Sequence, residues 1–214
     1  LELGAHRARP GDAVLVSGTM GDHGVTIMAS REGLGLEAPL SSDSAALNGL
    51  AGGVIVDCPG LRTLRDPTRG GLATVCHEIV HATGLHISLD GPAIPVQDPV
   101  QSVCEMLGYD PLFLACEGRV VAVVAPGASE RALDAWRSLP AGRSAAIVGE
   151  VREAPAKRLG AHEQAGAERR LVVRRETVIA EDPQPGCLYR QLPRDKDGNR
   201  RDLLDGVTAV NDGH

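Results

Sequence analysis

The sequence predicts an α/β sandwich, in which helices cover a mixed β-sheet. From residue 10 to residue 152, apolar runs of strand length alternate with amphipathic segments of helix length, as in layered α/β domains. Hydrophobic residues make up 43% of the 214, yet aromatic residues make up only 2%. A core of Val, Leu, Ile and Ala lets helices approach the strands closely, and the 26 glycines indicate many tight turns.

Short runs of β-branched and aliphatic residues mark the expected strands. We expect them at residues 13–17, 87–89, 112–116, 119–124 and 145–151, with a weaker one at 171–173. The two runs on either side of Glu117-Gly118 are predicted to be consecutive strands. The stretch through Cys58-Pro59-Gly60 to Asp66 is predicted to be a loop.

Apolar residues at helical spacing predict the helices. They are expected at residues 25–31, 44–52, 71–83, 99–107 and 129–139. Asp43 is predicted to be the N-cap of the second helix. The third helix is the clearest, and Gly84 is expected to end it.

The pattern also predicts the domain organisation. Residues 11–153 are expected to form the domain and residues 154–181 a terminal strand region. Residues 182–214 are rich in charge, Pro and Gly, and are predicted to be a flexible tail.

Composition argues against several classes of protein. The formal net charge is −6, and no basic stripe with interleaved aromatics suggests a nucleic-acid surface. No apolar run approaches the about 20 residues that a membrane-spanning helix needs. Five cysteines without a CxxC pair indicate reduced thiols and a cytoplasmic protein.

The segment Asp66-Pro67-Thr68-Arg69-Gly70-Gly71 comes directly before the clearest helix. A helix start presents unpaired N–H groups to an anion, and glycines allow a phosphate to approach the backbone. Asp66 can hold a cation, Thr68 can donate a hydrogen bond and Arg69 can neutralise charge. An ordinary capped turn fits these residues equally well.

Two further segments carry candidate proton-transfer groups. His23 lies in the turn GTMGDHG after the first strand, at a strand end where α/β sheets place ligands. Glu117 interrupts two apolar runs, and in a cleft desolvation would suit it to proton transfer. A solvated loop histidine and a plain turn glutamate are the alternatives.

Residues 77–81, HEIVH, match the zinc motif HExxH. The extended zincin pattern needs a third histidine six residues after His81, but Ile87 stands there and His86 is one residue short. We therefore expect no metal site here, and predict that His77 and His81 lie on the polar side of their helix. A zinc hydrolase that uses His77 and His81 is the alternative.

Three segments in order, GDAVLVSGTMGDHG, DPTRGGLATVCHEI and CEMLGYDPLFLACEGRVVAVV, resemble the HypE family of hydrogenase maturation proteins. SDSAALNGL fits as well, and the resemblance covers residues 10–152. That family belongs to the PurM-like, AIR synthase-related enzymes, which include selenophosphate synthetase and thiamine-phosphate kinase. The resemblance implies a PurM C-terminal-domain fold, with residues 1–10 as a linker remnant from a missing N-terminal ATP-binding domain.

The resemblance also implies an activity, an ATP-dependent carbamoyl dehydratase. Such proteins receive a carbamoyl group on a C-terminal cysteine from HypF and phosphorylate the carboxamide oxygen. Elimination then leaves a thiocyanate, whose cyanide passes to the iron of a nickel–iron hydrogenase through HypC–HypD. ATP and Mg²⁺ are the implied cofactors, bound mostly by the N-terminal domain, and the full-length family forms homodimers.

The motif match assigns candidate roles to individual residues. Asp66, Thr68, Arg69, Gly70 and Gly71 would bind phosphates. His23 and Glu117 would transfer protons.

The chain departs from the family at its tail, where a Pro-Arg-Ile-Cys end is expected but Leu192-Pro193-Arg194 runs on to His214. Cys187 is the candidate substitute for the acceptor cysteine, and the fragment alone is expected to be inactive. A non-catalytic binding module of the maturation complexes, or another PurM-like ATP-dependent enzyme, is the alternative.

Overall fold

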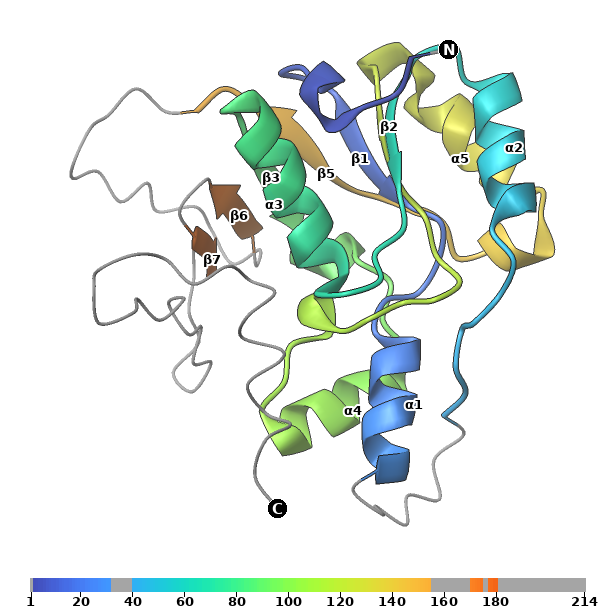
Figure 1. Ribbon diagram of the computed structural model, residues 1–214, viewed down its shortest axis with the longest axis vertical. Helices are drawn as coiled ribbons and strands as arrows, with labels where there is room; N and C mark the ends of the chain where they lie inside the picture. The colour runs from blue at the N-terminus through green and yellow to red at the C-terminus, as the bar shows by residue number, and fades with distance from the viewer. Residues whose placement is uncertain (1, 32–39, 155–169, 175–176, 181–214) are drawn as a thin grey trace.

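A computed structural model describes residues 2–31, 40–154, 170–174 and 177–180. Its strands form a seven-stranded sheet in the order β2-β4-β1-β5-β3-β6-β7 (Figure 1). The strands are β1 Ala13–Val16, β2 Leu61–Arg65, β3 His86–Asp90, β4 Val121–Val124, β5 Ala146–Arg152, β6 Arg170–Arg174 and β7 Thr177–Ala180. The α-helices are α1 Asp22–Arg31, α2 Asn48–Asp57, α3 Gly71–Thr83, α4 Asp98–Leu107 and α5 Ser129–Arg137. The expected α/β class is confirmed.

The sheet is not mixed as predicted, because every pairing between the described strands is antiparallel. β1, β2 and β3 do run in one direction, as their alternation with helices suggests. However, β4 inserts between β1 and β2, and β5 inserts between β1 and β3, each in the opposite direction. The three strands that run in one direction are thus separated from one another by β4 and β5.

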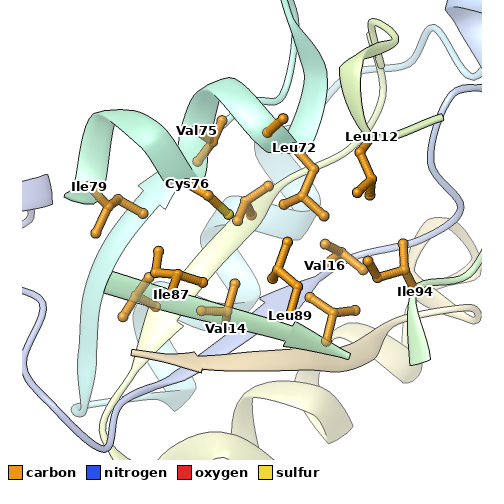
Figure 2. Close-up of a cluster of buried hydrophobic side chains, with 14 of the residues drawn as sticks. Val14, Val16, Leu72, Val75, Cys76, Ile79, Ile87, Leu89, Ile94 and Leu112 are labelled. Carbon is orange, nitrogen blue, oxygen red and sulfur yellow. The ribbon is translucent and has the colours of Figure 1, made fainter. Parts of the chain in front are cut away.

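Helix α3 covers one face of the sheet (Figure 2). Val14 and Val16 of β1 point to this face, together with Ile87 of β3, and they pack with Leu72 and other residues of α3. Successive strand residues alternate between faces, so Leu15 points to the opposite side. The buried side chains of this layer are those of Val, Leu, Ile, Ala, Met and Cys, as the low aromatic content predicts.

Helices α2 and α5 cover the other face (Figure 1). Leu15, Ala122 and Val124 of the sheet pack there against Trp136 of α5. The Trp136 indole Nε1 donates a hydrogen bond to the carbonyl oxygen of Leu50 in α2 at 2.9 Å. This bond satisfies a buried N–H and ties the two helices to each other.

Helices α1 and α4 form a separate pair at one end of the sheet (Figure 1). Their contact is a small apolar cluster of Val25, Val100, Val103 and Cys104. Helix α1 starts immediately after the turn that follows β1. The pair therefore fixes where that glycine-rich turn lies.

Three local predictions are wrong. Residues 112–116 are not a strand: Pro111–Phe113 form a 3₁₀ turn, and the carboxylate of Asp110 accepts a hydrogen bond from the N–H of Leu112 at 2.9 Å. Helix α2 begins at Asn48 rather than Ser44, and Asp43 is not its N-cap. Residues 61–65, predicted to be a loop, form the edge strand β2, in which the buried Leu61 and Thr63 alternate with the partly exposed Arg62 and Leu64.

The first residues of the chain pack on the domain. Gly4 N–H donates to the carbonyl of Arg62 at 3.0 Å, and the Ala8 side chain is buried beside α3. The predicted domain boundaries stay predictions, and residues 182–214, with Cys187, lie outside the described part of the chain. Within the described part, no helix has the length and apolar character needed to cross a membrane.

Candidate active site

The segment from Leu112 to Arg119, which we call the hub segment, joins the two glycine-containing motifs. Its Cys116 N–H donates to the carbonyl of Pro67 in DPTRGG at 3.0 Å. From the GDHG turn, Gly21 N–H donates to Cys116 Sγ at 3.2 Å and Gly24 N–H to the Ala115 carbonyl at 3.0 Å. Motifs that lie far apart in the sequence therefore meet at one place.

The DPTRGG turn leads into the first turn of α3 with left-handed backbone at two residues. Gly70 has φ 73° and Gly71 has φ 59°, a region that disfavours L side chains. A Cβ at Gly71 would lie 2.5 Å from the carbonyl oxygens of Leu112 and Leu114. The absence of a side chain at Gly71 thus allows the hub segment to lie against the start of α3. Leu112 anchors this segment in the core beside Leu72 (Figure 2).

The polar residues of the same turn are accessible. Asp66 and Arg69 are exposed and Thr68 is half-buried. Gly70, the N-cap of α3, provides no side-chain hydrogen bond to the helix start. The arrangement suits an anion at the start of this 13-residue helix, with a guanidinium nearby.

His23 is the second residue of α1 and is half-buried. Its Nδ1 atom lies 2.9 Å from the hydroxyl of Ser42, which also accepts a hydrogen bond from the Ser44 N–H at 3.1 Å. The hydroxyl fixes the orientation of the imidazole ring. A ring held through Nδ1 presents Nε2 as its other functional nitrogen.

Glu117 is exposed at the turn before β4. Its backbone N–H donates to the carboxylate of Asp43 at 3.1 Å. Asp43 directly follows Ser42, the partner of His23. The two predicted proton-transfer residues are therefore attached to adjacent positions of one segment, although they are remote in sequence.

A buried charge cluster lies under this arrangement, and the sequence analysis missed it. The Arg119 guanidinium contacts the carboxylates of Asp22 at 3.2 Å and Asp43 at 3.5 Å, and both carboxylates are nearly inaccessible. It also donates to the carbonyl and hydroxyl oxygens of Thr19, at 3.1 and 3.0 Å. The signal was available, because a charge directly before a buried apolar strand needs a partner.

Cys116 is not a reactive thiol. Burial raises its pKa to about 12, and the nearby carboxylates of Asp43 and Asp22 act in the same direction. The Gly21 N–H and Arg119 oppose this shift without cancelling it. The protonated thiol serves as a hydrogen-bond acceptor and not as a nucleophile.

The side chains of the HExxH match contact protein side chains in the structure. Glu78 forms an ion pair with Arg65 at 2.8 Å, and the ring centroids of His77 and His81 are 6.4 Å apart. Among residues 2–31, 40–154, 170–174 and 177–180, no group of three or more His, Cys, Asp or Glu side chains is placed to hold a metal ion. His77 is half-buried and His81 is exposed.

Comparison with known proteins shows the family to which this chain belongs. The family model described as AIR synthase related protein, C-terminal domain, matches residues 9–162. The chain therefore belongs to the AIR synthase-related family and has its C-terminal-domain fold. Thiamine monophosphate kinase of Aquifex aeolicus, at 20% identity and a TM-score of 0.52 over 71% of this chain and 51% of that chain, shares the fold alone.

Within the family, the chain is similar to HypE. Carbamoyl dehydratase HypE of Azotobacter vinelandii is 50% identical over 151 residues, covering 71% of this chain and 44% of that protein. The HypE of Escherichia coli K12 is 47% identical over 159 residues, covering 74% and 47%. The chain thus spans about half the length of the curated relatives it matches.

Solved structures agree with this similarity. The crystal structure of E. coli HypE superposes with a TM-score of 0.71 at 45% identity, covering 78% of this chain and 51% of that one. A HypE–HypF complex gives 0.70 at 43% identity over 72% and 50%. HypE in complex with ATP gives 0.69 at 42% identity over 72% and 46%.

Proposed function

We propose that this chain is the catalytic C-terminal domain of an ATP-dependent carbamoyl dehydratase of the HypE type. The reaction would convert a cysteine thiocarboxamide to a thiocyanate, which is the source of the iron cyanide ligand in nickel–iron hydrogenase. One observation carries the proposal: the GDHG and DPTRGG motifs meet on the hub segment, next to a turn that bears Glu117. High identity to HypE over the same residues supports it.

The DPTRGG turn fits the triphosphate of ATP at the start of α3. Thr68 and Arg69 would contact phosphate oxygens, because the helix start has no side-chain cap and Arg69 is exposed. Asp66, also exposed, would bind Mg²⁺ through its carboxylate. Gly70 and Gly71 would shape this turn, with Gly71 also leaving room for the hub segment.

When bound, ATP supplies the phosphoryl group that makes the carboxamide oxygen a leaving group. The carboxamide nitrogen must also lose two protons before a nitrile can form. With Nδ1–H donating to Ser42, His23 would accept one proton at Nε2. The exposed carboxylate of Glu117 would accept the other, and both groups would return their protons to water after each turnover.

Partners follow from the same proposal. HypF would deliver the carbamoyl group, since a HypE–HypF complex is among the similar structures. HypC–HypD would receive the cyanide, and the complete protein would act as a cytoplasmic homodimer. Cys187, which lies outside the described residues, is the candidate for the cysteine that carries the carbamoyl group.

A chimera tests the proposed function. The 151-residue stretch of A. vinelandii HypE that matches this chain is replaced by the residues of this chain. The chimera keeps the remainder of that protein, including its own tail. We expect phosphate release from ATP and a thiocyanate mass on the tail after carbamoylation.

The unaltered A. vinelandii protein is the positive control. A chimera that folds but releases no phosphate, while its parent does, contradicts the proposed function. His23→Gln and Glu117→Gln in the chimera should each lower kcat by about 100-fold or more, as general acid–base groups contribute. Unchanged kcat in both variants would remove them from the proton-transfer role.

A further inference from the structure

The geometry assigns Arg119 as a positioning residue. It would hold the segment that carries His23 and the segment that carries Glu117 at a fixed position relative to each other, as proton transfer requires. This inference rests on the proposed function, because it concerns the same site. Arg119 itself is half-buried, and its hydrogen bonds and ion pairs within the described part of the chain go to Thr19, Asp22 and Asp43 rather than to the His23 or Glu117 side chain. Its action would therefore pass through Asp22 and Asp43.

Arg119 connects three separate segments. It bonds Thr19 and Asp22 in the GDHG turn, directly before His23. It pairs with Asp43, which accepts the Glu117 N–H and follows the Ser42 partner of His23. His23 is thus held by its own helix start and by Ser42, and Arg119 pairs with the residue next to each of these attachments, Asp22 and Asp43.

The charges make the guanidinium necessary. Asp22 and Asp43 have side chains only 2% and 1% exposed, and Arg119 is 16% exposed. Two buried carboxylates on one cation would repel each other if the cation were removed. A planar guanidinium reaches both carboxylates and Thr19 at once, whereas the single ammonium of a lysine cannot reproduce this fork.

Two motif glycines leave space for the cluster. A Cβ at Gly18 would lie 2.9 Å from Arg119 Nε, and a Cβ at Gly118 would lie 1.7 Å from the Asp43 carbonyl oxygen. The Thr19 hydroxyl completes the cluster by donating to the Asp22 carboxylate. The glycines of both turns therefore serve the packing of Arg119 and Asp43.

Kinetics of the chimera test the role. Arg119→Lys keeps the charge, so the fold should survive, but the geometry is lost. We expect kcat to fall by about 10- to 100-fold, as for a small misplacement of reacting groups, with KM for ATP unchanged within about 2-fold. Arg137→Lys is the matched control, because Arg137 is exposed on α5 and donates to Ala145 away from this cluster.

Amide hydrogen exchange of the full chain provides a readout that needs no activity. In Arg119→Lys the Glu117 amide should exchange faster, because its acceptor Asp43 is displaced. The Gly24 amide, bonded to the Ala115 carbonyl in the same region, should keep its rate. Equal acceleration of both amides, or of neither, overturns the positioning role.

The outcomes separate the two proposals. An active chimera in which Arg119→Lys keeps its kcat overturns the role of Arg119 and leaves the proposed function standing. An unsubstituted chimera that folds without activity overturns the proposed function, and the positioning role falls with it. A fall in kcat together with selective exchange at Glu117 supports both.

Discussion

The Sγ atom of Cys116 accepts a hydrogen bond from the backbone N–H of Gly21 at 3.2 Å, across 95 positions of sequence. Both partners are buried. The bond joins the turn after β1 to the hub segment. The Cys116 N–H in turn donates to the Pro67 carbonyl of DPTRGG, so Cys116 links the two motifs of the candidate site.

Removing this acceptor should cost stability. Cys116→Ala leaves a buried N–H without its partner, and we expect the free energy of unfolding to fall by about 1–3 kcal/mol. Cys116→Ser keeps an acceptor and should be less damaging than the alanine variant. Urea unfolding followed by the fluorescence of Trp136, the sole tryptophan, measures both.

Cys76 is the matched control for the expected order at Cys116, in which serine is less damaging than alanine. It is equally buried, but lies in the apolar core on α3. There alanine should be tolerated better than serine, because a hydroxyl would enter an apolar environment. The same order at both positions would show that the Gly21–Cys116 bond contributes nothing measurable.

Gly71→Ala should be severely destabilising. The added Cβ would meet the Leu112 and Leu114 carbonyl oxygens at 2.5 Å, in addition to the strain of a positive φ. Gly84→Ala, at the end of the same helix, has φ 73° but no atom within 4 Å of its added Cβ. It should cost only about 1–2 kcal/mol of backbone strain.

Unfolding of the two glycine variants gives the comparison directly. A loss at Gly71 no larger than the loss at Gly84 would contradict the close approach of the hub segment to α3. The Gly71 variant should also expose thiols, since Cys116 follows the displaced carbonyls. Labelling of Cys116 by a thiol reagent under native conditions measures that exposure.

Stability should fall in alkaline solution. Burial raises the pKa of the Cys76 and Cys116 thiols from 9.0 to about 12. Below pH 9 both states are protonated and the thiols have no effect. Above pH 9 the unfolded chain loses protons that the folded chain retains, so each thiol should lower the free energy of unfolding by about 1.4 kcal/mol per pH unit.

Cys76→Ala isolates the contribution of one thiol. Its unfolding free energy should decline less steeply between pH 9 and pH 11 than that of the unsubstituted chain. Other groups titrate in this range too, but they do so equally in both proteins. Parallel pH profiles would show that the Cys76 thiol ionises in the folded protein.

The residues of the HExxH match should contribute little to stability and should bind no zinc. Arg65 and Glu78 are both about half exposed, so Glu78→Gln should change the unfolding free energy by only about 0–1 kcal/mol. Metal analysis of the purified chain should find no stoichiometric zinc. Zinc at one ion per chain, lost on His77→Ala, would instead revive the hydrolase interpretation.

Local patterns predicted most of the elements correctly, because each depends on nearby residues. Helix α3 begins at the predicted Gly71 and ends before Gly84, where left-handed backbone and apolar periodicity both act within a few residues. β1, β3 and β5 were recognisable from their apolar runs. The candidate residues His23 and Glu117 and the DPTRGG turn were visible as motifs, although their roles stay proposals.

Long-range contacts decided the order of the strands and the surroundings of the candidate site. The strands β4 and β5 insert between β1, β2 and β3, which run in one direction, and nothing in a local window specifies that order. Asp43 has the sequence of a helix cap, but burial beside Arg119 determined its position. A residue's local preference amounts to about 1 kcal/mol, whereas leaving a buried charge unpaired costs several times more.

The sequence by itself determined the α/β class, the central helix α3, the aromatic-poor core and the motifs that mark the family. Only the tertiary structure decided the antiparallel order of the sheet, the hub segment and the Asp22–Arg119–Asp43 cluster. The physical reason is the separation in sequence over which each interaction acts. Periodicity and turn chemistry act over a few residues, while the pairing of buried charges and the closure of a sheet join positions about a hundred residues apart.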